Sequence, residues 1–469
     1  MELNASDIAS ITGGTIAAGP ADARASSFTI DSRVLEPGAC FVALVAVRDG
    51  HDFVGDAFAR GATVALVARE VPAAAGARAL VVVADPLRAL GMLGAEARTR
   101  LEGTPVVGIT GSAGKTGTKD LMEAALGGPP AVHASPGSWN NEAGVPLTLL
   151  ATPPGARAVV LEMGARAQGD LATLCAIARP TAGVITNVGL AHAGPLGGPE
   201  GVARAKGELF EALPAGGLGV LDLHDAASDG IAARTAARVL RVSARGAHEA
   251  DVRAVGTRVD ELLRPRFTIE SPWGSHAVGL EVRGEHVVVN ALLAAAVALD
   301  AGLAIEAVVA GLASARPARW RMDVSRGPNG VVVVNDAYNA NPASTAAALR
   351  SLAAIPAPGR RIAVLGDMRE LGDHSVAEHA RIGDLTGALG IDALVCVGEE
   401  TAPLAAAARA GGVERVTTVD DAAGALTAVT DGEAPSEGDV VLVKGSRAVG
   451  LEAVALALLG GCDHEGSAP

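Results

Sequence analysis

The strongest constraint on the fold is a glycine-rich turn between a short apolar run and a helical pattern near residue 110. The apolar run at 106–110 predicts a buried strand, and residues 115–126 have helical spacing. A phosphate group needs closely approaching backbone N–H groups and gains from the positive end of a helix dipole. The turn therefore predicts a nucleotide phosphate site. Its candidate residues are Gly111, Ser112, Ala113, Gly114, Lys115 and Thr116.

The last two candidates have side chains that suit a bound nucleotide. Lys115 supplies a positive charge for the β- and γ-phosphates, and the Thr116 hydroxyl could hold Mg²⁺. The strict P-loop spacing is not met, because Ile109 occupies its first glycine position and Gly108 lies one residue too early. The alternative is a glycine-rich turn with no ligand, although the flanking strand and helix favour phosphate binding.

The length of 469 residues suggests about three domains, and the order of the apolar runs agrees with this number. Predicted strands at 41–44, 62–67 and 80–83 precede a predicted helix at 86–100. These elements indicate a small α/β domain over residues 1–103.

Strands and helices alternate from residue 104 to 315, which predicts a central domain with a parallel sheet covered by helices. A hairpin around 271–274 and a helix over about 290–301 close this part. Short buried strands recur over 316–469, which predicts a second α/β unit of the doubly wound, Rossmann-like type. The predicted strands of the two domains are 106–110, 158–161, 183–186, 331–334, 362–365, 393–397 and 440–443.

The charge balance excludes some classes of partner. With 38 basic and 52 acidic residues the formal net charge is −14, which argues against broad binding to nucleic acid or anionic membranes. No uncharged apolar stretch reaches the roughly 18 residues of a membrane span, and no signal peptide is visible. The four cysteines form no CxxC pair, so we expect reduced thiols and a cytoplasmic location.

Three further residues are candidates for ligand binding. Glu162 ends a predicted strand, and a carboxylate there could hold Mg²⁺ on ATP. His192 follows the predicted strand at 183–186, and Lys206 lies on a predicted helix. The alternatives are a surface or capping acid for Glu162, an ordinary polar histidine for His192 and a solvent-facing lysine for Lys206.

Two polar clusters follow strands of the last domain. Four valines lead into the cluster at 335–342, which contains Asp336 and the single tyrosine of the chain, Tyr338. Lys444 and Arg447 follow another strand and precede a helix, so they could form a small anion site. The alternatives are ordinary turn chemistry in the first cluster and a capped helix with surface cations in the second.

In this order, the motifs resemble the Mur ligase family of ATP-dependent amide ligases, over nearly the whole chain. The segments at 366–372 and 444–447 favour the members that add D-Ala-D-Ala. Ala46 and Ser138 are departures, because relatives usually have Gly and Asn there. The resembling segments are 31–33, 37–38, 41–44, 49–53, 110–119, 140–148, 162–165, 187–192, 203–208, 286–290, Arg321, 336–341, 366–372 and 444–447.

The resemblance implies a fold and a reaction. The expected fold is a small α/β N-terminal domain that binds uridine, a central P-loop domain that binds ATP, and a C-terminal Rossmann-like domain that binds the amine. The expected reaction joins D-Ala-D-Ala to the C-terminal carboxylate of UDP-MurNAc-tripeptide through an acyl phosphate, in cytoplasmic peptidoglycan precursor synthesis. ATP and a pair of Mg²⁺ ions are the implied cofactors, and we expect a monomer without bound nucleic acid or membrane insertion.

The resemblance also implies roles for individual residues. Beyond the loop, the ATP-binding residues are Asn290, Arg321, Asp336 and Asn339. The metal ligands are Thr116, Glu162, His192 and Lys206, the last as N6-carboxylysine. The catalytic residues are Lys115, Lys206, His192 and Glu162. The residues for the UDP-substrate are Ser32, Arg33, Asn140 and Asn141. The residues for the amine substrate are Lys444, Ser446 and Arg447.

Because the resemblance places ATP between two domains, we expect hinge closure near 315–319. The nearest alternative function is another amide ligase, either the sister enzyme that adds the third stem residue or a folylpolyglutamate synthase. The segments at 31–53 and 444–447 argue against both. An alternative of another class is a nucleotide-binding switch protein, which would not need Glu162, His192 and Lys206 together.

Overall fold

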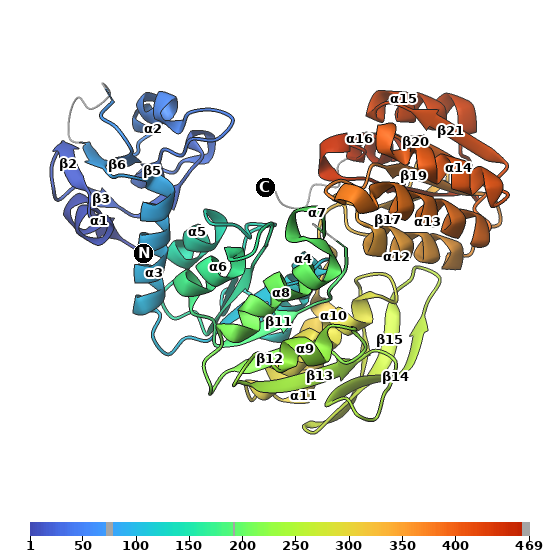
Figure 1. Cartoon of the computed structure of the whole chain (residues 1–469), viewed down its shortest axis with the longest axis horizontal. Helices are drawn as coiled ribbons and strands as arrows, with labels where there is room; N and C mark the ends of the chain where they lie inside the picture. The colour runs from blue at the N-terminus through green and yellow to red at the C-terminus, as the bar shows by residue number, and fades with distance from the viewer. Residues whose placement is uncertain (72–77, 191–192, 462–469) are drawn as a thin grey trace.

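The computed structural model describes residues 1–71, 78–190 and 193–461 and contains three α/β units in chain order (Figure 1). The first unit has a five-stranded sheet that is parallel except for its edge strand β2. The sheet order is β2 (Thr15–Ala18), β7 (Ala79–Val82), β6 (Val64–Val67), β5 (Ala39–Val42) and β4 (Ser27–Thr29). The unit also contains α1 (Ala5–Thr12), α2 (Val54–Ala59) and a ladder of β1 (Leu3–Asn4) with β3 (Arg24–Ala25).

The helix α3 (Pro86–Arg100) joins the first unit to the second. The side chain of Asp85 caps its first turn by accepting two backbone hydrogen bonds. The helix packs on α5 (Gly144–Ala151) and α6 (Asp170–Ala178), and a Cβ at Gly94 would lie only 2.7 Å from α5. One apolar core therefore continues from the first unit into the second.

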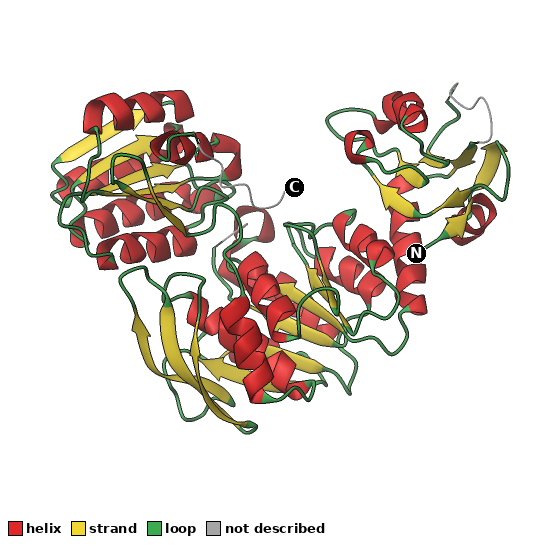
Figure 2. Ribbon diagram, turned by 180° about the vertical axis from the view of Figure 1, so that it is seen from behind, coloured by secondary structure: helices red, strands yellow, loops and turns green. Residues whose placement is uncertain are grey.

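The second unit is a nine-stranded sheet with helices on both faces (Figure 2). The first seven strands in the chain are parallel, and the last two add an antiparallel hairpin. The sheet order is β16 (Gly274–Gly279), β15 (Pro265–Ser271), β14 (Val252–Val259), β13 (Arg238–Ser243), β12 (Leu218–Asp222), β11 (Ala182–Ile185), β8 (Val106–Thr110), β10 (Ala158–Glu162) and β9 (Val132–Ala134).

The continuous apolar run of β8 is explained by burial on both sides of this sheet. Val106 packs on one face toward α5, α6 and α8 (Gly198–Glu211). Val107 and Ile109 pack on the other face toward α4 (Lys115–Ala125), α10 (Val287–Asp300) and α11 (Ile305–Ser314). The short helices α7 (Ala193–Leu196) and α9 (Ser228–Ala232) complete the unit.

The third unit has a six-stranded sheet, parallel except for β17. The sheet order is β17 (Asp323–Arg326), β18 (Val332–Asn335), β22 (Val440–Lys444), β19 (Arg361–Gly366), β20 (Ala393–Val397) and β21 (Arg415–Val419). One face is covered by α12 (Pro342–Ala354), α13 (Ser375–Ala388) and α14 (Ala402–Ala410), and the other by α15 (Ala422–Thr427) and α16 (Glu452–Leu458).

The strand order of the third unit gathers its polar segments at one edge. The last strand, β22, lies between β18 and β19, so the chain reverses its direction of winding there. Ligands of open α/β sheets bind outside the carboxyl ends of the strands at such a point. The predicted segments at 335–342, 366–372 and 444–447 follow these three strands and therefore meet at that edge.

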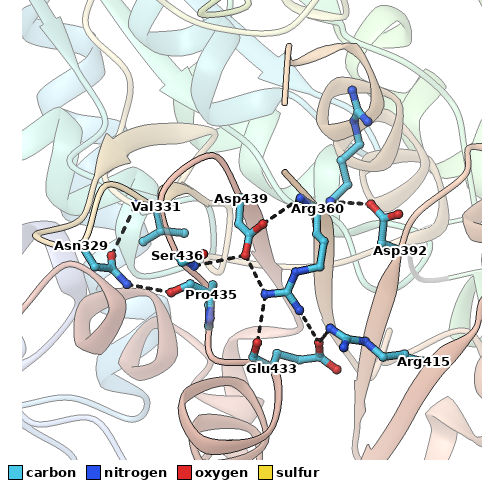
Figure 3. A network of polar contacts seen from close by, with 10 residues as sticks. Asn329, Val331, Arg360, Asp392, Arg415, Glu433, Pro435, Ser436 and Asp439 are labelled. Carbon is cyan, nitrogen blue, oxygen red and sulfur yellow. Dashed lines mark hydrogen bonds and ion pairs between the residues drawn. The ribbon is translucent and has the colours of Figure 1, made fainter. Parts of the chain in front are cut away.

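The opposite edge, at the amino ends of the strands, holds an ion-pair network of Arg360, Arg415, Glu433 and Asp439, called the distal network below (Figure 3). Arg360 pairs with Asp439 at 2.6 Å and with Glu433 at 3.2 Å, and Arg415 also pairs with Glu433. The side chains of Glu433 and Asp439 are only 9% and 5% exposed, so both carboxylates are buried. Each of them has a cationic partner in the network.

The structure confirms the predicted three-domain α/β class and the position of each predicted strand within about two residues. The hairpin predicted around 271–274 is the β15–β16 turn. No helix in the described ranges is long and apolar enough to cross a membrane. Cys40, Cys175 and Cys396 are buried free thiols, and burial raises the pKa of each to about 12. Cys462 lies outside the described residues.

Candidate active site

The glycine-rich turn between β8 and α4 has a backbone that requires glycine. Gly111 has φ 153°, and a Cβ there would lie 1.8 Å from the Thr186 hydroxyl oxygen. Gly114 has φ 80° and occupies the N-cap position of α4. The first N–H groups of an α-helix have no intrahelical partner, so those of α4 are available to an anion at this end.

Asn187, two residues after β11, holds the turn in place. Its Oδ1 accepts a hydrogen bond from the Ala113 N–H at 3.0 Å, and its Nδ2 donates to the Ala113 carbonyl at 3.0 Å. The Ser112 N–H donates to the Asn187 carbonyl at 3.0 Å. The backbone N–H groups of Ser112 and Ala113, two of the predicted phosphate-binding residues, therefore donate hydrogen bonds within the protein. Asn187 belongs to the segment at 187–192 that resembles the family, but its hold on the turn depends on β11 lying beside β8, which the sequence does not show.

Glu162 is 1% exposed and lies beside the start of α4. Its Oε2 accepts a hydrogen bond from Thr116 Oγ1 at 2.7 Å, and its Oε1 accepts one from Asn140 Nδ2 at 2.8 Å. Glu162 is therefore not the surface acid of the alternative interpretation. Asn140, expected at the UDP-substrate, lies next to the phosphate loop.

The two oxygen ligands of Thr116 and Glu162 fit a magnesium ion, because Mg²⁺ prefers hard oxygen ligands and is usually shared between a carboxylate and substrate phosphates. Within the described ranges, no group of three or more His, Cys, Asp or Glu side chains could hold a metal. His192, the third expected ligand, lies outside the described residues.

Two lysines of the central unit lie near each other in a desolvated position. Lys115 Nζ donates to the Gly111 carbonyl at 2.8 Å. Burial lowers the pKa of Lys115, which Glu162 partly offsets and the charge of Arg321 lowers further. Lys206, on α8, is 2% exposed, and burial together with the charge of Lys115 lowers its pKa well below the ordinary 10.5. The alternative of a solvent-facing Lys206 is wrong.

The third unit contacts the loop directly. Arg321 Nη2 donates to Thr116 Oγ1 at 2.9 Å, and its guanidinium carbon lies 4.0 Å from the centroid of the Tyr338 ring. The Tyr338 hydroxyl donates to Ser138 Oγ at 2.5 Å, and Asn341 Nδ2 donates to the Ser112 carbonyl at 3.3 Å. Arg321 thus lies at the loop, where the resemblance places an ATP-binding residue.

Two asparagines predicted to bind ATP differ in their surroundings. Asn290 on α10 is 5% exposed, and its amide lies 3.1 Å from where a Cβ of Gly114 would be. It therefore lines the loop. Asn339 is exposed, and its side chain accepts a hydrogen bond from the Ala340 N–H at 2.9 Å.

Asp336 and Lys444, expected at different substrates, form a buried pair with each other. Lys444 Nζ lies 2.6 Å from Asp336 Oδ2 and donates to the Asn339 carbonyl at 2.8 Å. Asp336 Oδ1 accepts from the Met322 N–H at 3.1 Å. Lys444 is 2% exposed, so the alternative of a surface cation is wrong for this residue.

The two other residues predicted for the amine substrate lie directly after Lys444. Ser446 is buried, and its hydroxyl accepts a hydrogen bond from the Arg369 N–H at 3.1 Å. Arg447 remains half exposed and pairs with Glu452 at 2.6 Å. The segment at 444–447 therefore offers one accessible cation, Arg447.

The residues predicted for the UDP-substrate are spread over two units. Ser32 is buried in the first unit, where exposed Arg33 pairs with Asp31 at 2.6 Å. Asn141 Oδ1 accepts from the Gly144 N–H at the start of α5. The first unit lies apart from the third, across the central unit (Figure 1).

Comparisons with known proteins identify the family of this chain. The Mur ligase middle domain model matches residues 109–298, and the model of the Mur ligase, glutamate ligase domain matches 320–447. A Mycobacterium tuberculosis protein named UDP-N-acetylmuramoyl-tripeptide–D-alanyl-D-alanine ligase is 43% identical over 98% of this chain and 98% of its own. The chain belongs to the Mur ligase family.

Solved Mur ligase structures have the same architecture. MurF from Acinetobacter baumannii superposes with a TM-score of 0.86 and 31% identity, covering 98% of this chain and 99% of its own. MurF from Thermotoga maritima in complex with ADP gives a TM-score of 0.78 and 28% identity, with 93% and 97% covered. The resemblance inferred from the motifs is therefore confirmed at the level of family and fold.

Proposed function

We propose that this Mur ligase joins D-Ala-D-Ala to the C-terminal carboxylate of UDP-MurNAc-tripeptide, using ATP, in cytoplasmic peptidoglycan precursor synthesis. The observation that carries the proposal is 43% identity along nearly the full length to a ligase of that name. The contact of Arg321 with the phosphate loop supports it, because a ligase needs both units at one nucleotide.

The chemistry explains why such an enzyme needs ATP. A carboxylate is a poor acyl donor, because an oxide is a poor leaving group. Transfer of the γ-phosphoryl group to the carboxylate gives an acyl phosphate and ADP. The amine of the dipeptide then attacks the acyl carbon, inorganic phosphate leaves, and the amine loses a proton as the amide forms.

The residues of the loop neutralise charge, since both reacting partners are anionic. We infer that Lys115, the N–H groups at the start of α4 and Arg321 bind phosphate oxygens, and that Asn290, Asp336 and Asn339 contact the nucleotide elsewhere. Thr116 and Glu162 would hold magnesium, which supplies charge neutralisation on the phosphates. Lys444 acts through Asp336, which it holds in place.

We further propose that Lys206 is carboxylated to N6-carboxylysine and holds a second metal ion with His192. Its lowered pKa favours the neutral amine, which can attack CO₂ to give a carbamate and release a proton. Replacing Lys206 with Ala should reduce ligase activity by at least about 10³-fold. Acetate should partly restore it, because acetate can supply the missing carboxylate. Full activity of Lys206→Ala without acetate would contradict the role.

The UDP-substrate is assigned to the first and central units, and D-Ala-D-Ala is assigned to the third unit. Ser32 and Arg33, with Asn140 and Asn141, bind the UDP-substrate, and Ser446 and Arg447 bind the carboxylate of D-Ala-D-Ala. The corresponding domains are 1–103, 104–315 and 316–469, with the hinge at 315–319. The protein acts as a monomer on these small molecules.

The deciding experiment is a phosphate-release assay with defined UDP-muramoyl peptides. We expect release that requires ATP, UDP-MurNAc-tripeptide and D-Ala-D-Ala together. Phosphate release with a UDP-muramoyl dipeptide and a free amino acid would favour the sister ligase. Phosphate release with a folate and glutamate would favour folylpolyglutamate synthase. ATP hydrolysis that ignores acceptor and amine would support a switch protein.

A further inference from the structure

Trp320 lies between the central and the third unit, and its backbone conformation is unusual. Its φ is 60°, in the left-handed region that a bulky residue rarely adopts, and Met322 nearby has φ 50°. The Tyr338 N–H donates to the Trp320 carbonyl at 3.2 Å, and the Arg321 N–H donates to the Ala318 carbonyl at 3.1 Å. Residues in such conformations persist when the surrounding structure holds them, and they cluster at functional sites.

The indole of Trp320 lies against two guanidinium groups. The Arg447 guanidinium carbon is 4.6 Å from the ring centroid, and that of Arg319 is 4.7 Å away. At these distances the negative face of the ring attracts a cation. The contact therefore joins the interdomain segment to the segment after β22, which is more than a hundred residues away in the chain.

Arg447 has a second fixed contact and still reaches solvent. Its Nη1 pairs with Glu452 Oε1 at 2.6 Å, and its side chain is 51% exposed. A guanidinium has its N–H donors in a rigid planar fork, so a pair at one nitrogen leaves other donors for a ligand. Two such donors can bind a carboxylate in parallel only if the plane of the fork is held in the correct orientation.

We propose that Trp320 is a positioning residue that orients Arg447 to bind the C-terminal carboxylate of the incoming dipeptide. The inference rests on the proposed function, which assigns Arg447 to that substrate. Trp320 itself contacts neither the substrate nor the reacting atoms. Its left-handed backbone and its carbonyl contact with Tyr338 place the indole under the guanidinium of Arg447, whose carbon lies 4.6 Å from the ring centroid.

The test compares kcat/KM for D-Ala-D-Ala with kcat/KM for its C-terminal amide, which lacks the carboxylate charge. Trp320→Ala should lower the ratio of kcat/KM for D-Ala-D-Ala to kcat/KM for the amide about fivefold, because a cation–π contact of ordinary strength is lost. Trp320→Phe keeps an aromatic face and should keep most of the ratio. Trp320→Gly removes the ring and also relaxes the left-handed backbone, so it should match the Ala variant. The KM for ATP should stay within about twofold in all three variants.

The outcomes separate this inference from the proposed function. If the wild-type enzyme ligates neither amine, the proposed function fails. If the wild type prefers the carboxylate and Arg447→Ala loses that preference while the Ala and Gly variants of Trp320 keep it, only the role of Trp320 is overturned. A Phe variant that loses as much as the Ala variant, or a Gly variant that keeps the ratio, also overturns it. An equal loss in the Ala and Gly variants with rescue by Phe supports it.

Discussion

The two edges of the C-terminal sheet both hold buried ionic groups, but they balance their charges differently. At the amino ends of the strands, the distal network pairs two arginines with two buried carboxylates (Figure 3). At the carboxyl ends, Arg321 extends to a loop where Lys115 and Lys206 already lie near each other and Glu162 is buried. At the first edge the cations and carboxylates are equal in number, whereas at the second Lys115 and Arg321 face the single carboxylate of Glu162, an excess of positive charge that suits a polyphosphate.

The pKa shifts express the same difference. Burial by itself raises the pKa of Asp439, but hydrogen bonds from Arg360 and from backbone N–H groups outweigh it, so the net shift is downward. The pKa values of Lys115 and Lys206 are also lowered, but there the shift means that the charged form is disfavoured. The protein thus stabilises the charged form of Asp439 at the distal network, whereas it disfavours the charged forms of Lys115 and Lys206 at the loop. Changes at the first edge should affect stability, and changes at the second should affect activity.

The largest expected effect is the loss of activity on replacing Lys115 with Met. We expect kcat/KM to fall by about 10³-fold or more, because a charge that stabilises the transferring phosphoryl group is lost. The thermal unfolding midpoint should stay the same or rise, because Met keeps the apolar stem and removes a poorly solvated charge. A large fall in the midpoint would show that Lys115 stabilises the fold and would break the comparison.

Asp336→Asn should affect both properties, because its partner Lys444 is buried. The free energy of unfolding of the third unit should fall by about 3 kcal/mol as Lys444 loses its counter-charge, and kcat/KM should fall with it. The double replacement Asp336→Leu with Lys444→Met should regain stability but not activity. Denaturant unfolding and phosphate release measure the two effects. Recovery of activity in the double variant would mean that the pair only supports the fold.

Arg360→Ala should cost stability alone. Asp439 then loses its cation, whereas Glu433 keeps Arg415, so we expect a loss of about 2 kcal/mol. Activity at 25 °C should remain within about twofold of the wild type, because the distal network lies at the edge away from the loop. Arg350→Ala on α12, an exposed position, serves as the matched control and should change stability by less than about 0.5 kcal/mol. A strong fall in kcat/KM at unchanged stability would contradict the separation of the two edges.

The contrast also explains how much of the molecule the sequence predicts. Strands such as β8 and β22 are short apolar runs buried on both faces, so their positions follow from hydrophobicity alone. The loop follows from local chemistry, because glycine and the Gly-Lys-Thr order act within a few residues. Lys206 could be placed only by resemblance, because a single lysine on a helix does not reveal which face is buried.

The contacts between distant segments are not visible in the sequence. Asn187 holds the loop because β11 lies beside β8, and Lys444 pairs with Asp336 because β22 inserts beside β18. The distal network depends on the same strand order, and no local pattern marks its residues. Pairing of charges over more than a hundred positions is decided by topology, so the sequence predicts the candidate residues better than it predicts their partners.

The smallest expected effect is a pH dependence at the distal network, tested with Asp439→Asn. The pKa of Asp439 lies below its ordinary 3.8 in the folded protein, so the folded state binds a proton less readily than the unfolded state does. Its contribution to stability is therefore complete above the ordinary pKa and is lost as the pH falls through the lowered one. Near neutral pH the wild type should exceed Asp439→Asn by about 1–2 kcal/mol in free energy of unfolding. That difference should shrink at pH values below 3.8, as followed by urea unfolding at a series of pH values. A difference that grows on acidification would mean that folding raises the pKa of Asp439 instead of lowering it, and the distal network would then lack the balance of charge that distinguishes it from the loop.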